Sequence, residues 1–392
     1  MKIAVSGIGV VSALGAGVGS NIEALQRSRS GIVDSPRLLA THLRVPVGEV
    51  PLSSDELAAM LGVGAHVSRT ALLGMLAARE ALDMAGPAEG LRTGLVSATS
   101  VGGMDRTEDF YRAYLSDPAG GRLRDTAMHD CSASTRAIAR YCGIDGFTTT
   151  ISTACSSAAN AILLGAKLLR HGVVDRVVVG GTDALSRFTL GGFESLQILD
   201  ERPCRPFDAT RAGLNLGEGA GYLVLQCEDT LRQAPCGYLT GWANANDAFH
   251  QTASSEHGEG AWRAMSGALE RAGVAPDEVD YVNVHGTGTP NNDLTEGRAL
   301  RRLFGDRVPP FSSTKGFTGH TLAAAGGIEA VFSVAALRSG TIWPSLNFAR
   351  PIDELGLKPE CRVRTGAALR CVLSNSFGFG GNCASLLFSK NG

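Results

Sequence analysis

The segment Ala154–Arg170 has the sequence ACSSAANAILLGAKLLR, and its apolar composition indicates which architecture the rest of the chain forms around it. It is long enough for a helix and is apolar around most of its circumference, which is typical of a helix inside a protein. Gly172 ends the pattern, and residues 177–179 (VVV) then form a continuous apolar run, typical of a strand covered on both faces. Strand and helix patterns alternate along the chain, with helical patterns at 21–28, 54–61 and 68–85, and this alternation predicts α/β layers.

A second segment of small residues resembles the first. Residues 318–324 (TGHTLAA) match 153–159 (TACSSAA) and open another helical pattern that ends near Gly340. Each copy is followed by a Gly-rich turn and an apolar strand, at 217–225 and at 378–388. This order predicts a duplicated α/β unit, although α/β proteins can also repeat such patterns by accident. Duplication would place Cys155 and His320 at the starts of two related central helices, whose N-termini can meet.

Composition narrows the class of protein. The chain has 392 residues, 44% apolar and 19% charged, which predicts one large folded domain or two fused ones. A net charge of −2 without long basic runs gives no indication of nucleic-acid or membrane-surface binding, and no apolar run is expected to span a membrane. Nine scattered Cys without a C-x-x-C pair argue against a disulfide framework and a zinc site. We expect a cytoplasmic enzyme without a metal.

Cys155 is the candidate nucleophile, because it alone among the Cys residues stands at a strand-to-helix junction with small neighbours. The first turn of a helix offers unpaired N–H groups and partial positive charge, which stabilise a thiolate and can hold an oxyanion. A buried structural Cys is the alternative, since most Cys residues are of that kind.

Two histidines lie in Gly/Thr-rich loops. His285 follows the strand pattern of 279–284, and His320 follows the loop that begins at Lys315. A single His most often has a structural role, but two in such loops favour a site. Taken alone, Lys315 has the pattern of a solvated surface residue. Glu296 has the pattern of an acidic residue that the helix dipole favours near a helix N-terminus. Cys and His together fit a protease, an acyltransferase or a condensing enzyme.

Five stretches resemble the β-ketoacyl-acyl-carrier-protein synthases, which are the elongating ketosynthases of the thiolase-fold superfamily. They occur in the family's order, at about its spacing, and span nearly the whole chain. They are 153–157 (TACSS), 207–221 (FDATRAGLNLGEGAG), 285–289 (HGTGT), 315–320 (KGFTGH) and 375–381 (NSFGFGG). The resemblance implies a thiolase-like, five-layered αβαβα fold made of two duplicated halves, at 1–235 and 236–392. It also implies acyl carrier protein as a partner, and a homodimer or a heterodimer with a homologous subunit.

The resemblance also assigns roles to residues. Cys155 matches the acylated nucleophile, while His285 and His320 match the pair that binds the malonyl thioester carbonyl. Lys315 matches a supporting cation, which we expect to pair with Glu296. The N–H groups of Cys155 and Phe379 match the oxyanion hole, Phe379 also matches a gate, and Thr287 and Thr289 match contacts to the pantetheine arm. The implied reaction needs no cofactor apart from the 4'-phosphopantetheine that carries the substrates.

Some positions depart from the family pattern. Ala212 replaces the usual acid after Arg211, Leu214 replaces an aromatic residue, and Asn382-Cys383 replaces the common Thr-Asn. These departures favour a type II polyketide or aryl-polyene pathway over housekeeping fatty-acid synthesis.

Alternative classes remain to be weighed. A non-catalytic chain-length subunit usually lacks the Cys that this chain keeps. A degradative thiolase uses a second Cys near the C-terminus, for which Cys383 is the candidate. An initiating ketosynthase would carry Asn in place of His320, and the buried Cys helix would admit a polypeptide poorly, which disfavours a protease.

Overall fold

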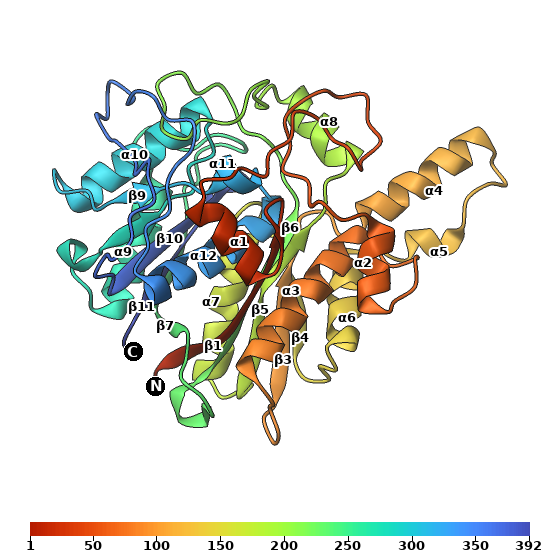
Figure 1. The fold of residues 1–392 in the computed structure, drawn as a ribbon, viewed down its shortest axis with the longest axis horizontal. Coiled ribbons are helices and arrows are strands. Elements are labelled where there is room, and N and C mark those ends of the chain that lie inside the picture. Colours follow the sequence, from red (N-terminus) through yellow and green to blue (C-terminus); the bar gives the residue numbers. More distant parts are fainter.

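Eleven strands form one hydrogen-bonded network in the computed structural model, which describes residues 1–392 (Figure 1). The strands are β1 (Ile3–Ser12), β2 (Gly15–Ala16), β3 (Thr93–Ala98), β4 (Thr148–Ile151), β5 (Arg176–Asp183), β6 (Gly219–Cys227), β7 (Gly237–Asn246), β8 (Tyr281–Asn283), β9 (Phe311–Ser312), β10 (Cys371–Gly378) and β11 (Asn382–Ser389). The β5 run 177–179, predicted as a strand covered on both faces, is fully buried.

The strand order is a mirror image about its centre. It runs β4-β3-β5-β6-β1 and continues β7-β11-β10-β8-β9, so that β1 corresponds to β7, β6 to β11 and β5 to β10. Corresponding pairs also agree in direction, since β5–β6 and β10–β11 are antiparallel while β3–β5 and β8–β10 are parallel. This correspondence is what the duplicated α/β unit predicts.

The two halves of the network meet through very few strand contacts. Strands β1 and β7 share only the residue pairs Ala4–Tyr238 and Val5–Gly237, whereas β1 pairs with β6, and β7 with β11, over most of their lengths. Each half therefore has a sheet of its own, and the two sheets are joined only at the beginnings of β1 and β7.

Helices lie outside and between the two sheets. They are α1 (Val18–Gln26), α2 (Ser54–Leu61), α3 (Arg69–Ala85), α4 (Met104–Ser116), α5 (Leu123–Thr126), α6 (Cys131–Tyr141), α7 (Ser157–Arg170), α8 (Arg187–Ser195), α9 (Glu259–Ala272), α10 (Pro290–Phe304), α11 (Lys315–Thr318) and α12 (Ala325–Ser339). Short 3₁₀ helices are η1 (Glu228–Thr230), η2 (Pro276–Glu278), η3 (Leu322–Ala324) and η4 (Phe379–Gly381).

The contacts between these elements define five layers. Helix α3 packs on β1, β5 and β6, and α9 packs on β7 and β11, with α10 against α9. Helices α7 and α12 contact each other and also contact strands of both sheets. The order is thus helix, sheet, central helices, sheet, helix, and the predicted αβαβα fold is confirmed.

Helix α12 is the most deeply buried helix of the core. Every residue from Ala325 to Leu337 is buried, because small and branched apolar side chains cover its whole circumference. The window Leu322–Ser339 is apolar and long enough to cross a membrane by composition, and 89% of it is buried inside the protein. The expectation that no apolar run reaches that length was therefore wrong, because a central helix of a large α/β protein needs the same composition.

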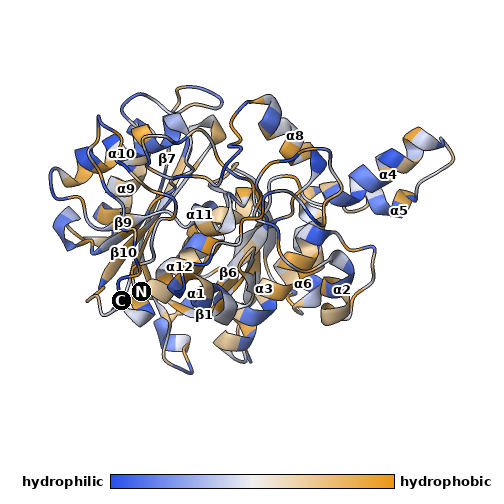
Figure 2. Cartoon of the chain, turned by 45° about the horizontal axis from the view of Figure 1, so that its top comes forward, coloured by the Kyte–Doolittle hydropathy of each residue, from blue (hydrophilic) through white to orange (hydrophobic).

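An arm formed by α4 and α5 projects from the body of the molecule (Figures 1 and 2). None of the residues of α4 is buried. Four apolar or aromatic side chains on the arm are exposed by 44% or more, namely Tyr111, Tyr114, Leu115 and Leu123.

Candidate active site

Cys155 lies in a strained elbow between β4 and α7. The sequence predicts a helix from Ala154, but α7 begins at Ser157, and Ala154 has a left-handed φ of 50°. The side chain of Ser157 holds this turn by accepting the N–H of Thr153 at 2.8 Å. Because α7 begins at Ser157, Cys155 lies just before the helix rather than in its first turn, and it is 6% exposed.

The loop after β10 lies directly against this elbow. A Cβ added to Gly378 would lie 2.9 Å from the Cys155 nitrogen, so only a glycine allows the two backbones to approach so closely. The next residue, Phe379, directs its N–H at the Cys155 sulfur. Two backbone N–H groups, of Cys155 and Phe379, thus belong to adjoining segments, as an oxyanion hole requires.

Burial dominates the acidity of the Cys155 thiol. It raises the pKa of Cys155 to about 12, while the positive charge of Lys315 and the Phe379 N–H act in the opposite direction. Burial therefore opposes the stabilised thiolate that the position of Cys155 next to a helix start predicts.

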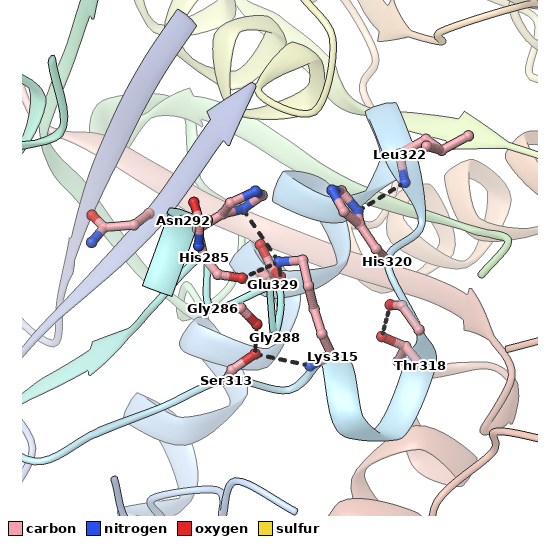
Figure 3. Close-up of polar contacts among 12 residues, drawn as sticks. His285, Gly286, Gly288, Asn292, Ser313, Lys315, Thr318, His320, Leu322 and Glu329 are labelled. Carbon is pink, nitrogen blue, oxygen red and sulfur yellow. Dashed lines mark hydrogen bonds and ion pairs between the residues drawn. The ribbon is translucent and has the colours of Figure 1, made fainter. Parts of the chain in front are cut away.

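Both histidines are buried and lie side by side (Figure 3). The rings of His285 and His320 are edge to face, with centroids 5.3 Å apart. Burial lowers the pKa of each well below 6.5, and the charge of Lys315 lowers it further, so both rings are neutral at pH 7.

Hydrogen bonds fix the tautomer of each ring. His320 Nδ1 lies 3.2 Å from the N–H of Leu322, and His285 Nδ1 lies 3.3 Å from the Lys315 ammonium nitrogen (Figure 3). Because a backbone N–H and an ammonium can only donate, both Nδ1 atoms accept and both protons lie on Nε2. Each ring therefore has one N–H to offer to another group.

Lys315 is buried and is paired with Glu329, not with Glu296. Its side chain is 2% exposed and its ammonium also donates to the His285 carbonyl at 2.6 Å. The predicted pairing with Glu296 is wrong because Glu296, on α10, accepts the N–H groups of His285 and Gly286 at 2.9 and 2.8 Å. Glu296 holds the backbone of the His285 loop, whereas Glu329 on α12 neutralises the cation.

The sequence does carry a signal for Glu329 that the sequence-based prediction overlooked. Glu329 is the only charged residue in the buried stretch 325–337 of α12, and such a residue needs a partner because an unpaired buried charge is costly. Burial raises the pKa of Glu329 to about 7, and Lys315 opposes that rise.

Two cavities meet at Cys155. The first, of about 310 Å³, is lined by Cys155 and both histidines and includes Thr287 and Thr289, whose hydroxyl oxygens lie 2.8 Å apart. The second, of about 400 Å³, is mainly apolar and includes Val101, Phe188 and Leu196. Cys383 lines the first cavity only.

A pair of aromatic rings separates the two cavities. Phe379 and Phe193, on α8, stack with centroids 5.9 Å apart, and both line both cavities. Phe193 was not predicted as a site residue. No group of three or more His, Cys, Asp or Glu side chains is arranged to hold a metal ion.

Comparison with known families supports one assignment. Residues 1–230 match the family model "Beta-ketoacyl synthase, N-terminal domain", and residues 236–349 match "Beta-ketoacyl synthase, C-terminal domain". The chain belongs to the β-ketoacyl synthase family. A curated relative, 3-oxoacyl-[acyl-carrier-protein] synthase 2 of Staphylococcus aureus (strain MRSA252), is 30% identical over 411 residues that cover 100% of this β-ketoacyl synthase and 98% of the relative.

Solved structures agree with this membership. The ishigamide ketosynthase/chain length factor superposes with a TM-score of 0.92 at 29% identity, covering 100% of this β-ketoacyl synthase and 99% of that chain. A structure of the ketosynthase ApeO in complex with its chain length factor ApeC from Xenorhabdus doucetiae gives a TM-score of 0.89 at 32% identity, covering 99% and 98%.

Proposed function

We propose that the chain is a β-ketoacyl-acyl-carrier-protein synthase that forms a C–C bond by decarboxylative condensation on Cys155. The observation that carries this proposal is that one cavity is lined by a buried Cys and two neutral, tautomerically fixed histidines. A hydrolase would need a site for water activation, whereas uncharged N–H donors suit an enolate oxygen.

The first step is acyl transfer. The Cys155 sulfur attacks the carbonyl of an acyl thioester, and the resulting oxyanion accepts the N–H groups of Cys155 and Phe379. The C–S bond to the carrier then breaks, and the thiol proton of Cys155 ends on the departing carrier thiolate. The product is an acyl-Cys155 thioester and a free carrier thiol, so the step needs no net uptake of protons.

The second step is decarboxylation of a malonyl thioester. The bond between the carboxylate carbon and C2 breaks, and CO2 leaves. The electron pair of that bond stays on C2 and forms an enolate whose charge lies on the thioester oxygen. The Nε2–H groups of His285 and His320 donate to that oxygen. Burial keeps both rings neutral, and the charge of Lys315, which Glu329 balances, adds to that effect.

The third step joins the two substrates. The enolate carbon attacks the acyl-Cys155 carbonyl, and the backbone N–H groups of Cys155 and Phe379 hold the new oxyanion. Collapse breaks the bond to sulfur, so Cys155 leaves as a thiolate and is reprotonated from solvent. The remaining product is a β-ketoacyl thioester on the carrier.

The substrates and partners follow from the cavities. We propose that the first cavity takes the phosphopantetheine arm of an acyl carrier protein, with Thr287 and Thr289 along its path. The second cavity would take the acyl chain, and Phe379 would separate the two. The exposed side chains of α4 and α5 would be covered by a homologous subunit, identical or different. We assign the halves as 1–235 and 236–392 and place the reaction in the cytoplasm.

Intact-protein mass spectrometry tests the proposal. The wild type, incubated with acyl carriers of several chain lengths, should gain one acyl group, and Cys155→Ala should gain none. His320→Ala should still be acylated but should release little CO2 from malonyl carrier. Cys142→Ala is the matched control, because Cys142 lines neither cavity at Cys155, and it should behave as the wild type. An adduct of normal yield on Cys155→Ala, or no adduct on the wild type with any carrier, would overturn the assignment.

A further inference from the structure

Asp183 is a buried carboxylate that the proposed chemistry does not use. It stands at the carboxyl end of β5 and is fully buried. Its Oδ1 accepts the Thr99 hydroxyl at 2.6 Å and the Ser100 N–H at 3.0 Å, and its Oδ2 accepts the Ala323 N–H at 2.8 Å. The Ser100 N–H also lies 3.1 Å from Oδ2.

Burial raises the pKa of Asp183, and these contacts oppose that rise by stabilising the ionised form of the carboxyl group. A carboxylate accepts about four hydrogen bonds and donates none, and here four donor contacts surround the two oxygens, three of them from backbone N–H groups that cannot reverse. Asp183 forms no ion pair with an Arg or Lys side chain, so its charge is held by neutral donors alone. A buried charge of this kind is costly and calls for a function.

The donors come from both halves of the molecule. Thr99 and Ser100 follow β3 in the N-terminal half, whereas Ala323 belongs to η3, immediately after His320 in the C-terminal half. The same short turn contains Leu322, whose φ of 52° is unusual for a branched side chain and whose N–H bonds to His320 Nδ1. Asp183 therefore anchors the strained turn that determines how the His320 ring is oriented.

The fit around this turn leaves little freedom. A Cβ added to Gly181, two residues before Asp183, would lie 2.9 Å from the Ala323 carbonyl oxygen. Strand β5 thus contacts η3 through its backbone and through the Asp183 carboxylate at the same point.

The charge of Asp183 also reaches the nucleophile. Three charged groups act on Cys155 from different elements: Lys315 of α11 lowers its pKa, while Asp183 of β5 and Glu329 of α12 raise it. The rings of His285 and His320 line the same cavity and are neutral. Asp183 also raises the pKa of Cys131 and Tyr222, where burial is the larger cause.

We propose that Asp183 is a positioning residue of the condensation site, whose carboxylate fixes the turn that points His320 Nε2–H at the substrate. This inference rests on the proposed function. A merely structural carboxylate would tie two segments together without affecting either the histidine or the sulfur.

The test compares two variants and a control. Asp183→Asn removes the charge and places an amide N–H₂ against N–H donors, and Thr99→Val removes one donor while leaving the contact to Ala323. Glu80→Gln is the matched control, because Glu80 also ties two backbone N–H groups, of Val10 and Val18, but lies outside both cavities at Cys155. Thermal unfolding of all three gives the structural cost of each change.

Two measurements report on the proposed role. The ratio of malonyl decarboxylation to Cys155 acylation should fall at least about tenfold in Asp183→Asn, less in Thr99→Val, and stay unchanged in Glu80→Gln. Alkylation of Cys155 by iodoacetamide, followed in folded protein at fixed pH, should be faster in Asp183→Asn than in the wild type, because burial raises the pKa of Cys155 and the negative charge of Asp183 adds to that rise.

The outcomes separate this inference from the proposed function. If the wild type neither takes up acyl groups nor releases CO2, the proposed function fails, whereas the alkylation arm still tests the charge effect. If the wild type condenses and Asp183→Asn keeps its decarboxylation-to-acylation ratio, or if Glu80→Gln lowers that ratio equally, the positioning role is overturned.

Discussion

Replacing Glu329 by Gln removes the counter-charge of a buried lysine without changing side-chain volume. The two side chains are 2% and 4% exposed, so the Lys315 ammonium would remain in the interior with only neutral acceptors, namely the His285 carbonyl and ring nitrogen and the new amide oxygen at position 329. Removing one partner of a buried ion pair typically costs about 3–5 kcal/mol. That is a large part of a typical folding free energy of about 5–15 kcal/mol.

Urea unfolding measures this cost directly. With a slope of roughly 3 kcal/mol per molar urea, Glu329→Gln should shift the midpoint down by about 1 M or more. The double variant Lys315→Met/Glu329→Leu should recover most of the stability, because replacing a buried ion pair by apolar residues of similar volume is often neutral to folding. It should not recover malonyl decarboxylation, since His285 Nδ1 then lacks its donor. A loss below about 1 kcal/mol in Glu329→Gln would refute the assignment of this pair.

Two further predictions concern the nucleophile and the aromatic pair. Because burial raises the pKa of Cys155 to about 12, the rate of its alkylation by iodoacetamide should rise about tenfold per pH unit from pH 7 to beyond pH 9. Mass spectrometry of the Cys155 peptide measures this rate, and a plateau below pH 8 would contradict the prediction. Phe193→Ala removes the ring that stacks on Phe379 and opens one cavity to the other. Acylation by a panel of carriers should therefore shift toward bulkier acyl groups, while Phe147→Ala, which lines neither cavity, serves as the control. An unchanged panel would show that the stack does not separate the cavities.

The sequence predicts those parts of the molecule that depend on local pattern or on order along the chain. The two small-residue segments predicted the duplication, and the αβαβα layers agree with it. Cys155, His285 and His320 were found because each stands in a loop of small residues at the edge of a strand or helix. The helix at 54–61 was correct to the residue, and that at 68–85 began one residue early, because Ser68 caps the helix from outside.

The remaining features depend on contacts between distant segments, which local pattern does not determine. Glu296 seemed a suitable partner for Lys315 by its place after His285, but the loop geometry turns its carboxylate to backbone N–H groups. The start of α7 was misplaced because the Ala154 elbow is imposed by Ser157 and by the close approach of Gly378. Asp183 has no local signature, since its donors come from two segments that lie far from it in the chain, at Thr99–Ser100 and at Ala323.

The narrow junction between β1 and β7 has a consequence for how the reacting groups are kept at a working separation. The two sheets are bonded together at the beginnings of these strands, while the chemistry lies beyond the carboxyl ends of β5 and β8, at the opposite end of the sheets. Near the reacting groups the spacing must therefore come from α7 and α12, where a Cβ on Gly326 would lie 2.9 Å from the Ala159 nitrogen. The two sheets are therefore held together by strand pairing at one end and by the contact between α7 and α12 at the other. The absence of a side chain at Gly326 sets how closely these two helices approach.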